Sequence, residues 1–97
     1  MDLLQALRTF SRVTETGSFS AVAREANTSH SSVTRQIGDL EAHFGVRLFH
    51  RTTRRLSLTE DGHDLVMYAR HMIELAETME GALGKQRRQR MLQGRAE

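Results

Sequence analysis

Apolar residues in the first part of the chain recur at helical spacing, and residues that favour helix ends separate the stretches. In the first stretch a single apolar stripe is formed by Leu3, Leu7, Phe10 and Val13 or Thr14. Asp2 is a good cap ahead of this stripe, and Gly17 can end the helix behind it. A helix is therefore predicted from Asp2 to about Thr16, with one face packed on a core.

A second, shorter helix is predicted after Ser18, which can cap it, and Asn27 can end it in a left-handed conformation. Its apolar positions are Phe19, Val22, Ala23 and Ala26. Thr28 or Ser29 can cap a third helix that runs to Phe44. Because so short a connection cannot let two helices lie flat and antiparallel, they must cross steeply, as in a helix-turn-helix unit.

The third helix has two different faces. One is an apolar line with spacings of four, three and four, made of Val33, Ile37, Leu40 and Phe44. The opposite face holds no bulky apolar group and no acid before Glu41, and it consists of Ser31, Arg35, Gly38 and Ala42, flanked by Ser32 and Thr34. Because this face lacks bulky apolar and acidic side chains, another surface can approach it closely.

Residues 46–51 and 56–59 are β-prone segments on either side of Thr52-Thr53-Arg54-Arg55. Apolar and polar residues alternate in both, which predicts a small hairpin with one face against the helices. The turn lacks the Asn-Gly signal of the tightest hairpins.

A long helix is predicted from Thr59, with Glu60, Asp61 and Asp64 near its positive end. Apolar positions then alternate at spacings of four and three, which is a heptad seam. The seam is either an ordinary intramolecular stripe or, as its length favours, a dimerisation surface. The residues assigned to dimerisation are Leu65, Ala69, Met72, Ile73, Ala76, Met79 and Leu83.

These elements predict a mainly α fold with a small β wing, that is, a winged helix-turn-helix followed by a long dimerising linker helix. The expected units are a winged helix-turn-helix at residues 1–58 and a linker helix at residues 59–88. Residues 89–97 are expected to be a frayed tail or the start of a linker. The 97 residues suit one small core, and no apolar run approaches the ~20 residues that span a bilayer, so no membrane partner is expected. The lack of Cys is compatible with a cytoplasmic location.

Thirteen of the fourteen basic residues are Arg, the residue that forks onto phosphates and guanine edges. Four of them lie between Arg47 and Arg55 without an acid, whereas acids gather from Glu60 onward. We expect double-stranded DNA as the partner, contacted by Ser18, Ser20, His30, Ser31, Thr34, Arg35, Arg51, Arg54 and Arg55. The plainer alternatives are a solvated surface for these residues and simple capping for the two serines. Arg47 can instead pair with Glu41 or Asp39, and Gln36 is a backbone contact or a structural residue.

Metal binding and catalysis find little support. His63 and His71 lie near one helical face, but they are too far apart to share an ion, and no Cys or carboxylate set completes a site. No nucleophile elbow or phosphate loop occurs either. We therefore expect no metal, no cofactor and no enzymatic activity.

Several motifs form one combined pattern along the chain. They are Phe10, Gly17-Ser18-Phe19-Ser20, Ala23, Ser29-His30-Ser31-Ser32-Val33-Thr34-Arg35-Gln36-Ile37, Leu40-Glu41, Gly45-Val46-Arg47-Leu48-Phe49-His50-Arg51 and Leu58-Thr59-Glu60-Asp61-Gly62. This pattern resembles the LysR-type bacterial transcriptional regulators over roughly residues 1–83. The resemblance implies a recognition helix in the third helix, a wing whose Arg54 reaches toward the minor groove, and linker helices that pair, generally antiparallel, on an inverted repeat.

The chain departs from the family in two ways. The family's recognition helix commonly begins Ser-Gln-Pro, whereas this one has Ser29-His30-Ser31 and lacks the proline that pre-sets the first turn. Family members also continue into a large α/β effector-binding domain. None is expected within these residues, so the chain is interpreted as a fragment or separate domain whose small-molecule effector would act elsewhere. The alternative function is a winged-helix protein-protein interaction module without DNA binding.

Overall fold

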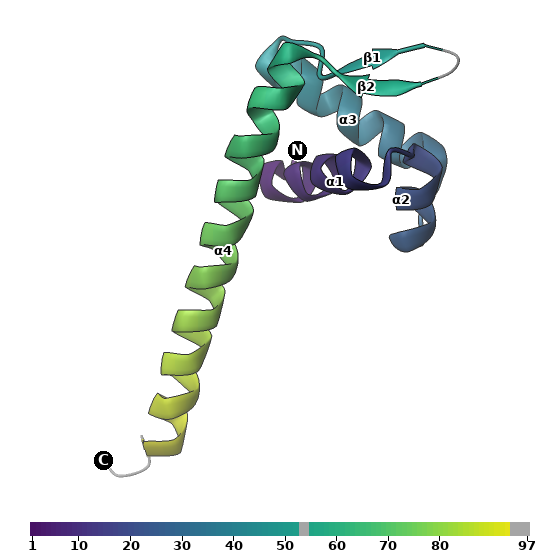
Figure 1. Ribbon diagram of the computed structural model, residues 1–97. Coiled ribbons are helices and arrows are strands. Elements are labelled where there is room, and N and C mark those ends of the chain that lie inside the picture. Colours follow the sequence, from purple (N-terminus) through teal and green to yellow (C-terminus); the bar gives the residue numbers. More distant parts are fainter. Residues whose placement is uncertain (53–54, 94–97) are drawn as a thin grey trace.

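The computed structural model describes the backbone of residues 1–52 and 55–93 and the side chains up to residue 84. The elements follow in the order α1 (Leu3–Thr16), α2 (Phe19–Glu25), α3 (His30–Phe44), β1 (Phe49–Arg51), β2 (Leu56–Leu58) and α4 (Glu60–Gln93). Three helices and the hairpin form a head, and α4 leaves it as a long rod (Figure 1). The whole measures 63 × 27 × 21 Å.

The predicted N-caps of the three helices in the head are confirmed, because the capping side chains make the expected hydrogen bonds. The second helix ends at Glu25, two residues before the predicted Asn27. The carboxylate of Asp2 accepts from the backbone N–H of Gln5 at 3.1 Å, and Ser29 Oγ accepts from that of Ser32 at 3.1 Å. Gly17 ends α1 with a φ of 71°, a left-handed conformation that costs glycine little. Asn27 adopts the same region, with a φ of 55°, in the connection before α3.

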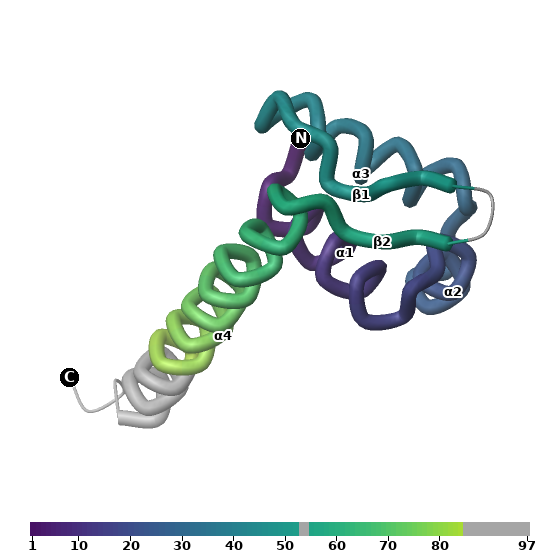
Figure 2. Tube along the Cα trace, turned by 45° about the horizontal axis from the view of Figure 1, so that its top comes forward, coloured from purple at the N-terminus to yellow at the C-terminus, as the bar shows by residue number. Residues whose placement is uncertain are grey.

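The core lies where α1, α3, the hairpin and the start of α4 meet. Its largest fully buried side chains are Phe10, Leu7, Ile37, Leu40, Leu48 and Val13. The rings of Phe10 and Phe49 lie 5.5 Å apart and join α1 to β1. Figure 2 shows the two strands side by side over the helices, antiparallel and in a register that pairs His50 with Ser57.

The first strand is shorter than predicted, because the chain between α3 and β1 is bound to α3 instead of to a strand. The backbone N–H of Val46 donates to the carbonyl oxygen of Glu41 at 3.1 Å, and that of Leu48 donates to the Glu41 carboxylate at 2.8 Å. The paired residues of β1 therefore begin at Phe49, although the carbonyl oxygen of Leu48 still accepts from the Thr59 N–H at 3.0 Å.

Two positions predicted as apolar contacts are exposed. Phe44, expected on the buried line of α3, is 45% exposed because α3 reaches past the core at its last turn. Ala26, expected on the apolar face of α2, is exposed because α2 ends at Glu25 and the chain turns away.

The long helix α4 begins as predicted, since Thr59 Oγ1 accepts from the backbone N–H of Gly62 at 2.9 Å. Gly62 is buried against Leu48, and a Cβ there would lie 2.2 Å from the Leu48 carbonyl oxygen. The helix extends to Gln93, beyond the expected boundary at residue 88, because residues 85–93 are nearly all good helix formers. In the described residues, none of the helices is both long and apolar enough to span a bilayer.

Candidate nucleic-acid interface

Five of the predicted site residues meet around one hollow, which we call the hairpin hollow. It has a volume of about 330 Å³ and opens between the start of α2, the first turn of α3 and the hairpin. Its lining includes Ser18, Ser20, His30, Arg51 and Arg55. Hydroxyl and guanidinium groups are suitable donors to phosphate oxygens. The fold therefore gathers such groups from three separate segments on one side of the head.

The outer face of α3 continues away from the hairpin hollow. Ser31 and Arg35 are exposed, and Arg35 forms no ion pair with any residue that the structure describes. Thr34 is half-buried, and its hydroxyl donates to the carbonyl oxygen of His30 at 3.0 Å. Because this proton is used within α3, Thr34 has less to offer a ligand than the sequence indicates.

His30 lies at the start of α3, next to a row of aromatic rings that leads into the core. Its ring meets the edge of Phe19 at 5.9 Å, and Phe19 in turn meets Phe49 at 6.0 Å. The side chain of His30 is exposed. These contacts orient the imidazole at the rim of the hairpin hollow while leaving it accessible.

Arg51 was predicted to contact DNA, but the protein itself holds its side chain. Its Nη2 donates to Glu41 Oε1 at 3.0 Å, and its guanidinium carbon lies 5.9 Å from the centre of the Phe19 ring. The side chain is 34% exposed. Arg51 thus braces the hairpin against α3 and α2, with part of its guanidinium still facing the hairpin hollow.

Sequence reasoning missed the importance of Glu41, which is buried and joins α3 to the hairpin. Its carboxylate accepts from Leu48 N–H and from Arg51, and Arg47 Nε lies 4.0 Å away. The predicted pairing of Arg47 with Glu41 is therefore present, although at long range and with an exposed Arg47. The available signal was the position of Glu41, four residues after Ile37 on the buried side of α3.

The hairpin tip is closed by Thr52 and Arg55. The backbone N–H of Arg55 donates to Thr52 Oγ1 at 3.1 Å, and that hydroxyl donates to the Arg55 carbonyl oxygen at 2.9 Å. The Arg55 side chain is exposed beside the hairpin hollow. Arg54, the remaining predicted wing contact, lies outside the described residues.

Polar side-chain pairs join α1 to α3 and to α2. Thr9 Oγ1 donates to Gln36 Oε1 at 2.7 Å, which identifies Gln36 as a structural residue. Arg12 pairs with Glu25, and this hydrogen bond lowers the pKa of the Glu25 carboxyl below its ordinary value. The Glu25 carboxyl therefore stays ionised to lower pH than a free one, and its charge faces Arg12 at the end of α2.

Residues predicted to form the dimerisation seam separate into two groups. In the single chain, the buried or half-buried members are Leu65, Ala69, Ile73 and Ala76. The exposed members are Met72, Met79 and Leu83. Leu65 and Ala69 belong to the core cluster, so their apolar surface is not available to a second chain. The exposed apolar residues at spacings of four, three, four and four are Tyr68, Met72, Leu75, Met79 and Leu83, which we call the α4 stripe.

The histidines considered for a metal site do not belong to a cluster of possible ligands among the described residues. His63 and His71 are both exposed on α4. Among residues 1–52 and 55–93, no three side chains of His, Cys, Asp or Glu come together in a way that could hold a metal ion.

Comparisons with known proteins agree with this geometry. The chain is 44% identical over 80 residues to the HTH-type transcriptional regulator BlaA of Streptomyces cacaoi, a match that spans 82% of this chain and 24% of BlaA. It is 37% identical over 95 residues to the probable HTH-type transcriptional regulator LtrA of Klebsiella pneumoniae, spanning 98% of this chain and 30% of LtrA. The chain thus spans less than a third of the length of these relatives.

Solved structures confirm the predicted winged-helix fold. The DNA-binding domain of BenM in a complex with DNA superposes with a TM-score of 0.80 at 29% identity, over 84% of this chain and 92% of that one. The complex of the CbnR DNA-binding domain with DNA gives a TM-score of 0.74 at 36% identity, over 88% and 93%. The family model for bacterial regulatory helix-turn-helix proteins of the lysR family matches residues 4–63. This chain therefore belongs to the lysR family of bacterial regulatory helix-turn-helix proteins.

Proposed function

We propose that this chain is the sequence-specific DNA-binding and dimerisation part of a bacterial transcriptional regulator. The observation that carries the proposal is the outer face of α3, which is exposed, bears Arg35 and has no acid from His30 to Gly38, directly beside the hairpin hollow. Two similar solved structures are DNA-binding domains in complexes with DNA, which supports the same partner here.

In this proposal α3 lies in the major groove, which is wide enough to admit one helix. Arg35, Ser31 and His30 face base edges or phosphates. Ser18 and Ser20 approach a phosphate at the start of α2, and Arg55 and Arg54 reach the adjacent minor groove. Arg51 contributes through its half-exposed guanidinium while it holds the hairpin in place.

The unit that binds DNA is residues 1–58, and α4 is the linker through which two chains pair. A twofold dimer places two recognition helices on successive turns of a duplex, which requires an inverted repeat. The chain acts in the cytoplasm, needs no cofactor for this step and performs no reaction. Any response to a small molecule belongs to the part of its relatives that this chain does not span.

The DNA-binding proposal is tested by selecting duplexes from a random pool and measuring affinity for the enriched sequence by fluorescence anisotropy at fixed salt. Arg35→Ala should weaken binding by ~1–3 kcal/mol, since a guanidinium that reads a base is worth about that much. Arg70→Ala is the matched control, because Arg70 is also an exposed arginine but lies on α4 instead of α3. Its affinity should stay close to that of the unchanged chain.

A protein-protein interaction module is the rival function. It predicts no enriched duplex and equal, weak DNA affinity for the unchanged chain and for Arg35→Ala. Finding both would reject the DNA-binding proposal.

Pairing through α4 is tested by light scattering on Met72→Glu combined with Met79→Glu. Two carboxylates on the α4 stripe should yield monomers, because burying them unpaired is costly. Met67→Glu is the control, since Met67 is 59% exposed on α4 but lies off the stripe. A dimer that survives the double substitution would show that the stripe is not the contact.

A further inference from the structure

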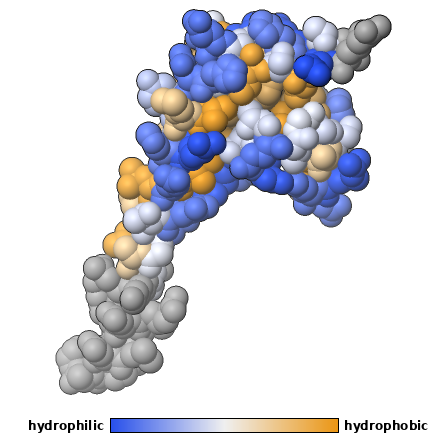
Figure 3. Space-filling model, viewed as in Figure 1, coloured by the Kyte–Doolittle hydropathy of each residue, from blue (hydrophilic) through white to orange (hydrophobic). Residues whose placement is uncertain are grey.

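Among the described residues that line the hairpin hollow, His30 is the one whose charge can change near neutral pH. The residue is exposed, and its ring lies 5.9 Å from that of Phe19. Figure 3 shows that hydrophilic residues predominate around the edge of the head, whereas apolar surface lies nearer its middle and along α4. A ligand in the hairpin hollow therefore meets one side chain that can be either neutral or cationic.

The charged side chains that share the hairpin hollow with His30 are cations. Arg51 belongs to β1, and Arg55 directly precedes β2. The segment from the end of α1 to α2 adds no charge, since its lining residues are Gly17, Ser18, Phe19 and Ser20. The start of α3 itself carries the partial positive charge of a helix N-terminus. In the free chain, these neighbours do not favour a further positive charge on His30.

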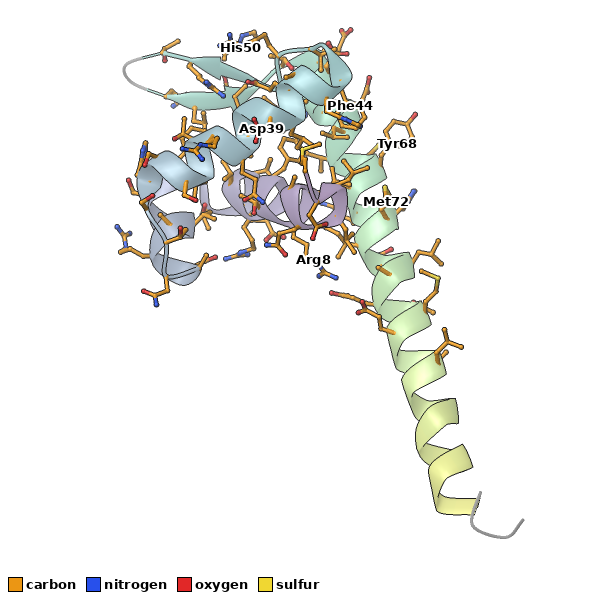
Figure 4. The ribbon with its side chains drawn as sticks, turned by 180° about the vertical axis from the view of Figure 1, so that it is seen from behind. Arg8, Asp39, Phe44, His50, Tyr68 and Met72 are labelled. Atoms are coloured by element: carbon orange, nitrogen blue, oxygen red, sulfur yellow. The ribbon has the colours of Figure 1, made fainter. Side chains whose placement is uncertain are left out.

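The acids closest to this region are paired or distant. The carboxylate of Glu41 accepts from Arg51, and Glu25 at the end of α2 is bonded to α1. Asp39 follows His30 by nine residues, which is about 13 Å along the helix axis, and Figure 4 shows it in the middle of α3. A duplex in the proposed site would therefore bring negative charge that the described side chains do not supply at His30.

Thr34 indicates which ring nitrogen carries the proton when His30 is neutral. The Thr34 hydroxyl donates its one proton to the His30 carbonyl oxygen at 3.0 Å. Toward Nδ1 of the ring, which is 3.5 Å away, this hydroxyl can only accept, and that favours a proton on Nδ1. Nε2, at the far end of the ring, is then without a proton. Because phosphate oxygens are acceptors as well, the neutral ring has no proton to offer them from this atom.

We propose that His30 binds a DNA phosphate in its protonated form, through Nε2, so that binding of the duplex takes up a proton. This inference rests on the proposed DNA-binding function and specifies the atom and the charge state through which His30 acts. The protonated ring has an N–H at both nitrogens. Nδ1 can then keep Thr34, while Nε2 donates to a phosphate oxygen that Arg51 and Arg55 also face.

The direction of the pH dependence follows from proton linkage. A phosphate stabilises the cation, so the complex holds the proton more tightly than the free chain does. The additional affinity is complete at acidic pH, and it is lost as pH rises through the range in which the complex releases its proton. Histidines change their charge between about pH 5 and 8, so DNA binding should weaken from the lower to the upper end of this range.

Fluorescence anisotropy with the duplex enriched by selection measures this dependence at fixed salt. Between about pH 8 and about pH 5.5, the dissociation constant of the unchanged chain should fall by about five- to tenfold, as for a proton held roughly ten times more tightly in the complex. His30→Gln cannot gain a charge and should lose most of this pH dependence. His30→Arg, a cation at every pH, should also bind independently of pH, and more tightly than His30→Gln at about pH 8.

Two other histidines serve as controls. His63 is also exposed but lies on α4, so His63→Gln should retain the pH dependence of the unchanged chain. His50, which Figure 4 shows on the hairpin, pairs with Ser57 and does not line the hairpin hollow, so His50→Gln should retain it too. Loss of the pH dependence in His50→Gln, with its retention in His30→Gln, would overturn the proposal.

Titration calorimetry detects the proton directly. At about pH 6.5, titrations in buffers with different ionisation enthalpies should show net proton uptake when the unchanged chain binds DNA, and much less uptake for His30→Gln. A merely structural role of His30 would change the affinity of the variant without removing proton uptake. Equal uptake by the two proteins would therefore refute the proposal.

The salt dependence distinguishes a phosphate from a base edge as the partner of Nε2. One additional phosphate contact should make the slope of log affinity against log salt steeper by about 0.9 at acidic pH than at about pH 8. Equal slopes, with a different base enriched at one position when the selection is repeated at acidic pH, would place the imidazolium on a base edge and overturn the assignment to phosphate.

Failure of this inference and failure of the proposed function give different results. The absence of an enriched duplex at any pH would refute the DNA-binding function itself. An enriched duplex that the unchanged chain binds equally well from about pH 5.5 to about pH 8 would leave that function intact and refute only the proton-dependent contact of His30.

Discussion

Glu41 is the residue whose replacement most directly tests how α3 and the hairpin are joined. Its side chain is only 10% exposed, and its two oxygens accept from the Leu48 N–H at 2.8 Å and from Arg51 Nη2 at 3.0 Å. Glu41→Ala removes both acceptors at once. It leaves the N–H of a buried residue and a half-covered guanidinium without their partner.

The expected loss of stability follows from these contacts. A hydrogen bond to a charged group contributes about 1.5–3 kcal/mol, and breaking a buried ion pair by removing one member costs about 3–5 kcal/mol. Because Arg51 keeps partial access to water, we expect the low end, about 3 kcal/mol for Glu41→Ala. That is a large share of the roughly 5–15 kcal/mol that stabilises a small domain. Glu41→Gln should cost less, since its amide oxygen can still accept one of the two bonds.

Urea unfolding followed by circular dichroism measures this loss, at one fixed chain concentration because dimerisation adds to apparent stability. Glu15→Gln is the matched control, since Glu15 is an exposed carboxylate that pairs with Arg12. We expect a change below about 0.5 kcal/mol there. A loss below about 1 kcal/mol for Glu41→Ala would refute the reasoning, because it would mean that the buried carboxylate contributes no more than a surface one.

Three further outcomes follow from local geometry. Gly62→Ala should destabilise the fold by about 2 kcal/mol or more in urea, because its Cβ would lie 2.2 Å from the Leu48 carbonyl oxygen, whereas Gly81→Ala, with open space around it, should not. Gly17→Ala should cost roughly 1 kcal/mol, because the φ of 71° disfavours any Cβ, and an unchanged urea midpoint would contradict this. The depressed pKa of Glu25 means that its bond with Arg12 stabilises the fold fully above the ordinary pKa of 4.5 and is lost as pH falls through the lower folded-state pKa. The urea midpoints of the unchanged chain and of Arg12→Gln should therefore converge only below about pH 4.5, and a constant gap down to acidic pH would count against this assignment.

The local structure of the head follows from the sequence because neighbouring residues carry its signals. Asp2, Ser18 and Ser29 cap the helices at which they stand, and Gly17 and Gly45 end α1 and α3 in left-handed conformations. The two faces of α3 were equally predictable, since helical spacing sorts apolar from polar residues without reference to the rest of the chain. These features, with the motif pattern, were sufficient to predict the winged-helix fold.

Tertiary structure decided which surfaces are covered and which side chains meet. The heptad pattern of α4 does not reveal that the head takes Leu65 and Ala69 for its own core, which leaves the exposed stripe on a neighbouring face with Tyr68 and Leu75. Nor does the sequence pattern reveal that Arg51, predicted to contact DNA, donates a hydrogen bond to Glu41 within the protein. Periodicity reports only that a face is apolar or polar. The side chain that a given residue contacts can lie far away in the sequence, as with Thr9 and Gln36 or Arg8 and Glu77. Only the packed fold brings such residues together.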